Sequence, residues 1–155
     1  HNTLTNIRIR QAVTADIPAL TMLLKHLFSQ ESEFKPEESL QADGLGLILN
    51  NPDYGVIFAA ENRQQNEIIG MVSLLFTIST ALGGKVAILE DMIVDSASRG
   101  TGIGSCLIES ALSYAAENDF KRITLLTDAD NSMAQRFYKT NGFYESDMKV
   151  MRRLL

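Results

Sequence analysis

The sequence predicts a mixed α/β (α+β) fold built as a single domain over residues 1–155. Its length of 155 residues suits one compact domain with one core. Segments with strand and helix periodicity are interleaved, and a strand-loop-helix-strand unit lies at the centre of the chain. No internal repeat, low-complexity tract or linker divides the sequence.

The first half begins with a strand and a helix. Thr14 is expected to cap the helix, and Asp16 in its first turn suits the positive end of the helix dipole. Strands are expected at Ile7–Val13, Tyr54–Ala60, Glu67–Thr77 and Lys85–Val94. The helix should bury a stripe made of Ile17, Leu20, Leu24, Leu27 and Phe28, and the third strand should place Ile68, Val72, Leu74 and Phe76 on one face. The stretch Gln30–Asn51 predicts a partial helix weakened by Gly44 and Gly46.

The second half opens with a glycine-rich loop that leads into a strong helix. The expected buried face of that helix consists of Ile103, Leu107, Ala111, Leu112 and Ala115. Arg122–Thr127 is a near-continuous apolar strand, typical of a strand buried on both faces. Asn131 is expected to cap a short helix that Asn141 and Gly142 end. Phe143–Leu155 should close the chain as one or more strands.

Composition excludes several classes of function. The net charge is −5 and no block of Lys or Arg stands out, which disfavours binding to nucleic acid. The single cysteine, Cys106, rules out an intramolecular disulfide, and one Cys with two His makes a structural zinc site improbable, so no metal is expected. No apolar run approaches the roughly 20 residues that span a bilayer, and no leader pattern opens the sequence. We therefore expect a cytoplasmic protein without a membrane partner.

The loop Arg99-Gly100-Thr101-Gly102-Ile103-Gly104 carries the main functional signal. A strand leads into three alternate glycines and then directly into a helix, a layout that points several backbone N–H groups at one place. Glycine lets the backbone approach an anion closely, and Arg99 adds positive charge beside it. A phosphate or pyrophosphate is the natural ligand. The plain alternative is a tight turn between strand and helix.

Two other phosphate-binding motifs fit poorly. A P-loop consists of a glycine, four residues of any type, and then Gly-Lys-Ser/Thr, and the sequence has no such run. A dinucleotide fingerprint requires Gly-x-Gly-x-x-Gly, but the position after Gly100 and Gly102 that should hold the third glycine is Ser105.

The loop and a second motif resemble the GNAT superfamily of acyl-CoA-dependent N-acyltransferases. The family's Arg/Gln-x-x-Gly-x-Gly/Ala motif, which follows its fourth strand, matches residues 99–104. A second signature matches Asn131, Ala134, Phe137-Tyr138 and Gly142-Phe143. The resemblance is specific from about Val86 to Phe143 and looser before that. It implies a mostly antiparallel mixed sheet, splayed between the fourth and fifth strands and flanked by helices.

The resemblance also implies how acetyl-CoA, the expected co-substrate, would bind. The loop Arg99–Gly104 and Ser105 should hold the pyrophosphate, and the backbone of the fourth strand should bind the pantetheine arm and the acetyl carbonyl. Asn131 should touch the pantetheine arm across the splay. The full set of implied cofactor-binding residues is Met92, Ile93, Val94, Arg99, Gly100, Thr101, Gly102, Ile103, Gly104, Ser105, Asn131, Ala134, Phe137 and Tyr138.

Two residues are candidates for proton transfer. An alkylamine with a pKa near 10.4 is neutral in only about one molecule in 2,500 at pH 7, so a base is needed. Glu90 is the candidate base, because a carboxylate in an apolar strand is costly without a function or a partner; an ion pair is the alternative. Asp91 points to the opposite face unless a bulge intervenes, and is a weaker candidate for binding a cation. The resemblance implies that Tyr138 protonates the departing thiolate, whereas a half-buried packing role is the alternative.

Other polar residues carry weaker signals. Glu31 and Glu33 occupy a segment that borders the acceptor pocket in the family, although a solvated loop explains them as well. Cys106 is expected to be a small buried core residue, and His26 a packed or surface residue of the first helix. Asp128 and Asp130 are expected to be loop or capping residues before the short helix rather than metal ligands.

The sequence therefore predicts an acetyl-CoA-dependent N-acetyltransferase that acts by direct attack in a ternary complex. The Leu89-Glu90-Asp91 run is similar to family members that acetylate polyamines and amino sugars, which favours a small primary amine, including amino-acid-like ones, as acceptor. Alternatives are a protein Lys or N-terminal acetyltransferase, a non-catalytic CoA-binding module, and a nucleotide-binding module. Family habit implies a homodimer.

Overall fold

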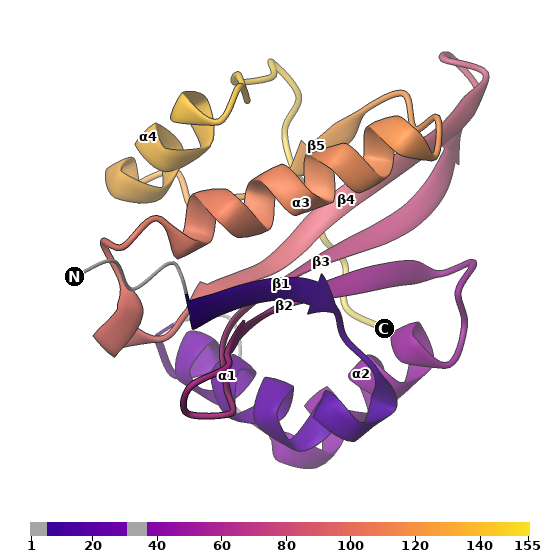
Figure 1. Ribbon diagram of the computed structural model, residues 1–155. Coiled ribbons are helices and arrows are strands. Elements are labelled where there is room, and N and C mark those ends of the chain that lie inside the picture. The colour runs from indigo at the N-terminus through magenta and orange to yellow at the C-terminus, as the bar shows by residue number, and fades with distance from the viewer. Residues whose placement is uncertain (1–5, 31–36) are drawn as a thin grey trace.

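The computed structural model describes residues 6–30 and 37–155, with the side chains of residues 28–30 outside the description. A single sheet lies between two helical layers, with α3 and α4 on one face and α1 and α2 on the other (Figure 1). The sheet has five strands in the order β1-β2-β3-β4-β5. Its first three pairings are antiparallel and the β4–β5 pairing is parallel, which confirms the predicted mixed fold.

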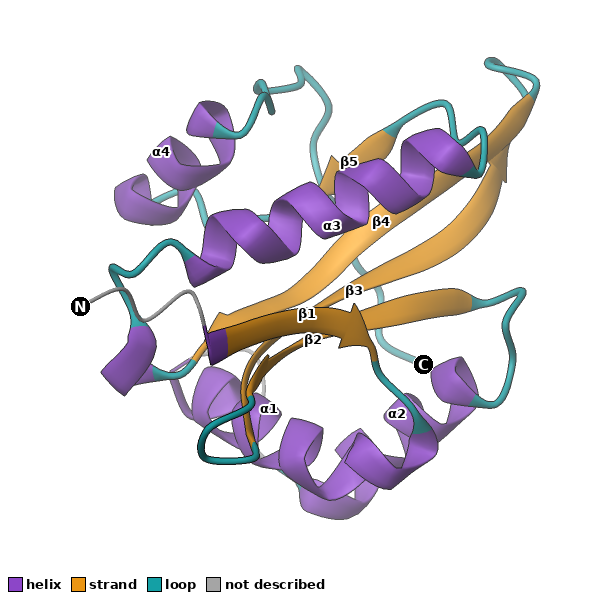
Figure 2. Cartoon of the chain, in the orientation of Figure 1, coloured by secondary structure: helices purple, strands orange, loops and turns teal. Residues whose placement is uncertain are grey.

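The strands and helices follow the predicted order with adjusted boundaries. The strands are β1 (Ile7–Gln11), β2 (Gly55–Asn62), β3 (Glu67–Ser79), β4 (Gly84–Val94) and β5 (Ile123–Leu125). The helices are α1 (Ile17–Gln30), α2 (Glu38–Leu49), α3 (Ile103–Glu117) and α4 (Ser132–Thr140), with short 3-10 turns at Thr14–Asp16 and Ser96–Ser98 (Figure 2). Among the described residues, no helix is both long enough and apolar enough to cross a membrane.

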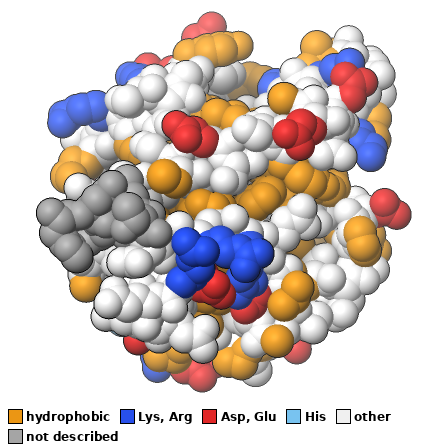
Figure 3. All heavy atoms as spheres, viewed as in Figure 1, with side chains coloured by type: hydrophobic (Ala, Val, Ile, Leu, Met, Phe, Trp, Pro, Cys, Tyr) orange, Lys and Arg blue, Asp and Glu red, His pale blue; other side chains and the backbone are white. Residues whose placement is uncertain are grey.

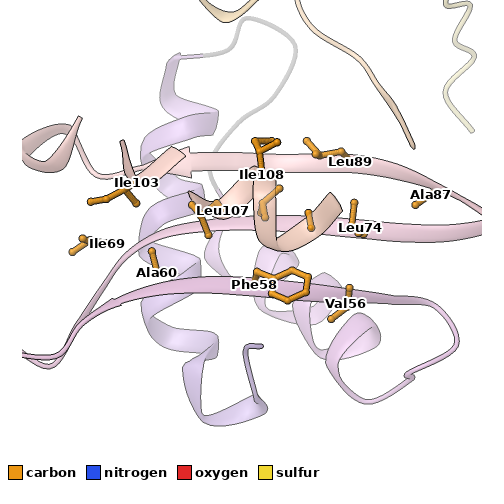
Figure 4. Packing of buried hydrophobic residues seen from close by; sticks show 12 residues of the cluster. Val56, Phe58, Ala60, Ile69, Leu74, Ala87, Leu89, Ile103, Leu107 and Ile108 are labelled. Atoms are coloured by element: carbon orange, nitrogen blue, oxygen red, sulfur yellow. The ribbon is translucent and has the colours of Figure 1, made fainter. Parts of the chain in front are cut away.

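Two apolar cores lie on the two faces of the sheet. The α3-side core packs one face of the strands against α3 (Figure 4), and its buried members are Val56, Phe58, Ala60, Ile69, Val72, Leu74, Ala87, Leu89, Ile103, Leu107, Ile108 and Ala111. The α1-side core packs the other face against α1 and α2, with Ala12, Leu20, Leu23, Leu24, Leu45, Ile57, Ala59, Met71 and Ile93 buried. Burial on both faces fixes which side each β3 and β4 side chain takes, and this places the candidate site residues.

Three expectations about buried faces need correction. Ile68 packs on the α1-side core, whereas Val72 and Leu74 pack on the α3-side core, because the β2–β3 register shifts between Ala60 and Glu61. On α3, Ile108 rather than Leu112 completes the buried face. On β5, Thr124 is exposed, so this edge strand is not buried on both faces.

The expected helix cap at the start of α1 is also wrong. Thr14 opens a 3-10 turn, and the Asp16 carboxylate, not the Thr14 hydroxyl, accepts the Val13 N–H at 2.8 Å. In α2, the two glycines do not end the helix, because Leu45 is buried and Ile48 and Leu49 pack on the α1-side core. The Phe28 side chain, placed in the α1 stripe by sequence, lies outside the description.

The segment Phe143–Leu155 was expected to form strands, and it adopts neither helix nor strand (Figure 2). β5 is only three residues long, so a strand added at its edge would gain few backbone hydrogen bonds. The segment also carries charged residues between its apolar ones, and Met148, Met151 and Leu154 are exposed. Phe143 packs against the α3-side core, whereas the large apolar residues after it are exposed and stay outside both cores.

An ion-pair cluster ties the start of α1 to the edge of the sheet. The Arg10 guanidinium donates to both Asp16 carboxylate oxygens, at 2.8 and 2.9 Å, and to Glu61 at 3.1 Å. Arg10 lies on β1, Glu61 on β2, and Asp16 immediately before α1. The hydrogen bond from Arg10 lowers the pKa of the Asp16 carboxyl below its ordinary value.

We predict that Asp16→Asn lowers the melting temperature at pH 7 by about 5 °C, because a largely buried two-point charged hydrogen bond is lost. Since the folded-state pKa of Asp16 is lowered, its stabilisation is full above the unfolded value near 3.9 and is lost as pH falls through the folded value. The gap between wild type and variant should therefore hold from pH 7 to about 5 and close at lower pH. The exposed Asp53→Asn is the control in thermal scans; an equal loss in both variants, or a gap that persists at pH 2, would contradict the assignment.

Candidate active site

The sheet opens between β4 and β5. β5 pairs with β4 only over Ala87–Leu89, opposite Ile123–Leu125, and β4 then continues to Val94. The Asp95 N–H bonds to the Ile69 carbonyl of β3 at 2.7 Å, so the preceding carbonyl, that of Val94, points away from β3 and toward the opening. An extended ligand could therefore bond to β4 where a neighbouring strand is missing.

A bulge in β4 lies beside this opening. Ser73 of β3 is opposite Glu90 and Met71 is opposite Ile93, so Asp91 and Met92 together face the single residue Val72. Asp91 has φ +52°, in the left-handed region that Asp tolerates better than most residues. The extra residue changes the alternation of side chains in β4. The sequence allowed for a bulge but gave no position for it.

The bulge places Glu90 and its neighbours on defined faces. Leu89, Met92 and Val94 pack with the α3-side core, whereas Ile93 belongs to the α1-side core. Glu90 follows Leu89 before the bulge and therefore points to the α1/α2 face, where it is exposed. Ile93, one of the expected cofactor-binding residues, points its side chain into the α1-side core, and its register partner on β3 is Met71. The Ile93 side chain thus supports the strand from within this core, and only its backbone could meet a ligand.

The glycine loop leads from β4 into the N-terminus of α3. Gly100 and Gly102 have φ values of +78° and +88°, a conformation that side-chain-bearing residues rarely adopt. The first N–H that bonds back into α3 is that of Cys106, to the Gly102 carbonyl at 3.1 Å, and no side chain in the described part of the chain caps this helix end. The preceding amides of the first turn, those of Ile103, Gly104 and Ser105, are the groups a helix leaves for an anion.

Two side chains of the loop hydrogen-bond to nearby backbone carbonyls and help to fix its conformation. Thr101 donates its hydroxyl hydrogen bond to the Ser98 carbonyl, and Arg99 donates from Nε to the Val94 carbonyl at 3.1 Å. The Ile103 side chain is buried in the α3-side core, so only its backbone can meet a ligand. Arg99 is exposed beside the loop.

Gly104 has a packing role that the sequence did not reveal. A Cβ added there would lie 3.2 Å from the Phe137 ring and 3.3 Å from the Met92 methyl group. The missing side chain therefore lets α3, α4 and β4 converge at one point. The alternating glycines of the motif thus have different functions: the first two permit left-handed backbone, and the third permits close packing.

Tyr138 lies on α4, within an aromatic cluster on the α3 side of the sheet. Its ring contacts Phe137 and Phe143 edge to face, with centroids 5.3 and 5.9 Å apart, and it packs against the α3-side core. Burial raises the pKa of the Tyr138 hydroxyl above its ordinary value near 10. The hydroxyl is therefore protonated at neutral pH and can act only as a proton donor there.

Asn131 caps α4, as predicted. Its side-chain oxygen accepts the Ala134 N–H at 3.0 Å, so this oxygen is already used within the protein. A ligand could be contacted by the side-chain amide nitrogen or by the second lone pair of this oxygen. Ala134 is half-buried, and its backbone serves the cap.

The remaining predicted residues lie elsewhere. Glu31 and Glu33 fall outside the described residues. His26 is exposed on α1, and the exposed Asp128 and Asp130 lie in the loop before α4, where the Asp128 carbonyl accepts from Gln135. Within residues 6–30 and 37–155, no cluster of three or more His, Cys, Asp and Glu side chains could hold a metal ion.

Cys106 is half-buried rather than part of the core, and it lines a groove between α3 and β1 together with Ile9, Phe58 and Tyr114. Figure 3 shows hydrophobic side chains along this groove, with basic side chains gathered over β1.

A second pocket lies between α1 and the β2–β3 turn and includes His26 and Asp95. Neither pocket contains the bulge or the glycine loop.

Comparison with known proteins agrees with this geometry. A family model described as "Acetyltransferase (GNAT) family" matches residues 19–143. The uncharacterized N-acetyltransferase YhfO of Bacillus subtilis is 32% identical over 90% of this chain and 91% of its own. The aminoalkylphosphonate N-acetyltransferase of Salmonella typhimurium is 25% identical (94% and 90% covered), and the thialysine N-epsilon-acetyltransferase of Sus scrofa is 28% identical (88% and 84% covered).

Solved structures share the fold. A possible acetyltransferase from Clostridium difficile 630 superposes with a TM-score of 0.86 at 16% identity, with 96% of this chain and 97% of the other covered. A predicted acetyltransferase from Clostridium acetobutylicum, solved with acetyl-CoA, superposes with a TM-score of 0.80 at 22% identity, covering 95% and 96%. The family match spans both motifs and most of the helices and strands. The chain therefore belongs to the GNAT family of acetyltransferases.

Proposed function

We propose that the chain transfers an acetyl group from acetyl-CoA to the primary amine of a small molecule, with the thioester lying in the opening between β4 and β5. The observation that carries this proposal is that the two candidate proton-transfer residues lie on opposite faces of the sheet. Glu90 points to the α1/α2 face, whereas Tyr138 packs on the α3 face. An amine that attacks the thioester carbonyl from one side of the sheet and a thiolate that leaves toward the other side would each have a proton-transfer group nearby.

The residues around the opening fit acetyl-CoA. The left-handed backbone at Gly100 and Gly102 and the uncapped N-terminus of α3 suit the pyrophosphate, with the exposed Arg99 adding positive charge. Beyond Leu89, the unpaired side of β4 offers the backbone of Met92 and Val94 to the pantetheine arm. The Asn131 amide nitrogen and the half-buried Phe137 complete the binding surface.

The reaction proceeds by direct attack. The neutral amine adds to the thioester carbonyl, and the backbone N–H near Met92 stabilises the oxyanion of the tetrahedral intermediate. Glu90 takes the amine proton, and the C–S bond then breaks as the Tyr138 hydroxyl donates its proton to the departing sulfur. Because the Cys106 thiol lines the α3–β1 groove, away from the bulge, it is not assigned the role of an acetyl carrier.

The acceptor is a small molecule. The acidic pair Glu90 and Asp91 at the bulge would attract a cationic amine. Two relatives at 25% and 28% identity are named for aminoalkylphosphonate and thialysine, both small molecules. These names support the class of acceptor rather than a particular compound.

An amine panel tests the function. We expect acetyl-CoA to release thiol when the protein is supplied with one or more of spermidine, glucosamine, 2-aminoethylphosphonate and thialysine, and to react less with a lysine peptide. A rate confined to the peptide would instead make the protein a protein acetyltransferase. CoA binding without turnover on any amine would indicate a non-catalytic module.

We predict that Gly100→Ala weakens CoA binding about tenfold, because a Cβ at this position strains the left-handed backbone and blocks close approach of the pyrophosphate. Gly83→Ala is a matched control, since Gly83 has φ +70° in the β3–β4 turn and, like Gly100, has no atom within 4 Å of an added Cβ. Both variants should lose similar thermal stability, and only Gly100→Ala should change the Kd measured by calorimetry. Equal affinities in the two variants would place the pyrophosphate elsewhere.

We predict that Tyr138→Phe lowers kcat by about tenfold to a thousandfold and leaves the Kd for CoA nearly unchanged. Because burial raises the pKa of Tyr138 above its ordinary value near 10, its donor form is lost only at higher pH than in an ordinary tyrosine, and the wild-type rate should show no loss from this group around neutral pH. Tyr144→Phe makes the same change at a side chain that is 89% exposed and should keep the wild-type rate. A Tyr138→Phe variant with full kcat would remove the acid assignment.

A further inference from the structure

One polar side chain in the sheet is buried without a partner. Ser73 on β3 is 0% exposed, and its hydroxyl is the buried side-chain group that lacks a hydrogen bond among the described residues. A buried hydroxyl without a partner has lost its hydrogen bonds to water and destabilises the fold, so such groups usually have a reason to be retained. An alanine at this position would avoid that cost.

Ser73 shares a face and a register position with Glu90. It is opposite Ile57 on β2 and opposite Glu90 on β4. Ile57 belongs to the α1-side core, and residues directly opposite in a sheet share a face, so Ser73 and Glu90 both point to the α1/α2 side. The neighbours of Ser73 along β3, Val72 and Leu74, pack on the other side, as alternation requires.

The bulge begins immediately after this pair. Asp91 and Met92 follow Glu90, and beyond them β4 is unpaired on its β5 side. Opposite residues of an antiparallel pair have Cβ atoms about 5 Å apart. The flexible Glu90 side chain, exposed in this structure, can therefore turn back within hydrogen-bond reach of the Ser73 hydroxyl.

We infer that Ser73 is a positioning residue for Glu90: its hydroxyl donates a hydrogen bond to the Glu90 carboxylate when the acceptor amine is bound. This inference rests on the proposed function. The amine proton passes to one oxygen of the Glu90 carboxylate, while Ser73 keeps its own proton and bonds to the other oxygen. The Ser73 hydroxyl gains its missing partner, and the carboxylate loses the freedom that exposure allows.

A second consequence separates this role from a structural one. Since the hydroxyl has no partner in the unliganded protein, its removal should not reduce stability. Ser79 provides the contrast on the same strand, because it is also buried but its hydroxyl accepts the Leu82 N–H at 3.1 Å in the β3–β4 turn. The same Ser-to-Ala change should therefore have opposite effects at the two positions.

The test compares Ser73→Ala, Ser73→Cys, Ser79→Ala, Glu90→Gln and the double variant Ser73→Ala/Glu90→Gln, with acetyl-CoA and the best acceptor of the amine panel. We expect Ser73→Ala to lower kcat about tenfold, with the KM for acetyl-CoA and the melting temperature at or above wild-type values. Ser73→Cys, which replaces the hydroxyl with a slightly larger and weakly donating thiol, should be intermediate. Ser79→Ala should melt lower and keep the wild-type kcat.

The double variant decides whether Ser73 acts through Glu90. In the Glu90→Gln background, removing the Ser73 hydroxyl should change kcat by less than about twofold. Full activity of Ser73→Ala, a marked fall in its melting temperature, or an undiminished tenfold loss in the double variant would each overturn the inference while leaving acetyl transfer in place. Failure of the wild-type protein to acetylate any amine would instead overturn the proposed function, and the inference with it.

Discussion

The opening between β4 and β5 is the constraint on which the rest of the site depends. The parallel β4–β5 pairing ends after three residues, so on this side the rest of β4 has backbone N–H and C=O groups with no neighbouring strand to bond to. Such an arrangement is costly inside a protein unless another group supplies the hydrogen bonds. Here the Arg99 side chain takes the Val94 carbonyl. A ligand with amide groups along an extended arm, as in pantetheine, offers the same kind of bonds to the rest of the strand.

The bulge turns this opening into a site with two distinct sides. If residues 90–92 alternated regularly with no bulge, Met92 would lie on the same face as Glu90, and the side chain that packs beside Gly104 would point the wrong way. The bulge lets Leu89, Met92 and Val94 all remain in the α3-side core, while Glu90 stays on the α1/α2 face. The two cores thus hold the bulged strand from both sides, and the positions of the acid and base candidates follow from that packing.

Close packing of α3 against α4 fixes the position of Tyr138, the candidate acid. Phe137 fits against Gly104, and the neighbouring Tyr138 is enclosed by Phe137 and Phe143. The contact between Phe137 and Gly104 therefore positions both the N-terminus of α3 and the neighbouring Tyr138 hydroxyl. Pyrophosphate binding and proton donation would be linked through one small cluster of side chains rather than arising independently.

Sequence periodicity and motif spacing were enough for the α/β class, the order of strands and helices, the cap on α4 and the glycine loop. These features depend on local conformational preferences, on apolar periodicity, or on residues that are close in the chain. Local preferences gave a wrong prediction at the start of α1, where Thr14 was expected to be the cap. There the Asp16 carboxylate accepts hydrogen bonds from Arg10 and from the Val13 N–H instead. It failed again at Phe143–Leu155, where apolar content suggested strands but the short β5 offers little edge to pair with.

The sequence by itself determined which residues could bind a phosphate and carry protons, because glycine, Arg, Glu and Tyr bring that chemistry wherever they are placed. Only the tertiary structure decided which face each of them takes. The register of β3 against β4, the position of the bulge and the packing of Phe137 on Gly104 all depend on contacts between residues distant in the chain. A shift of one residue in a strand reverses every side chain after it, and the sequence contains no local signal strong enough to set that shift.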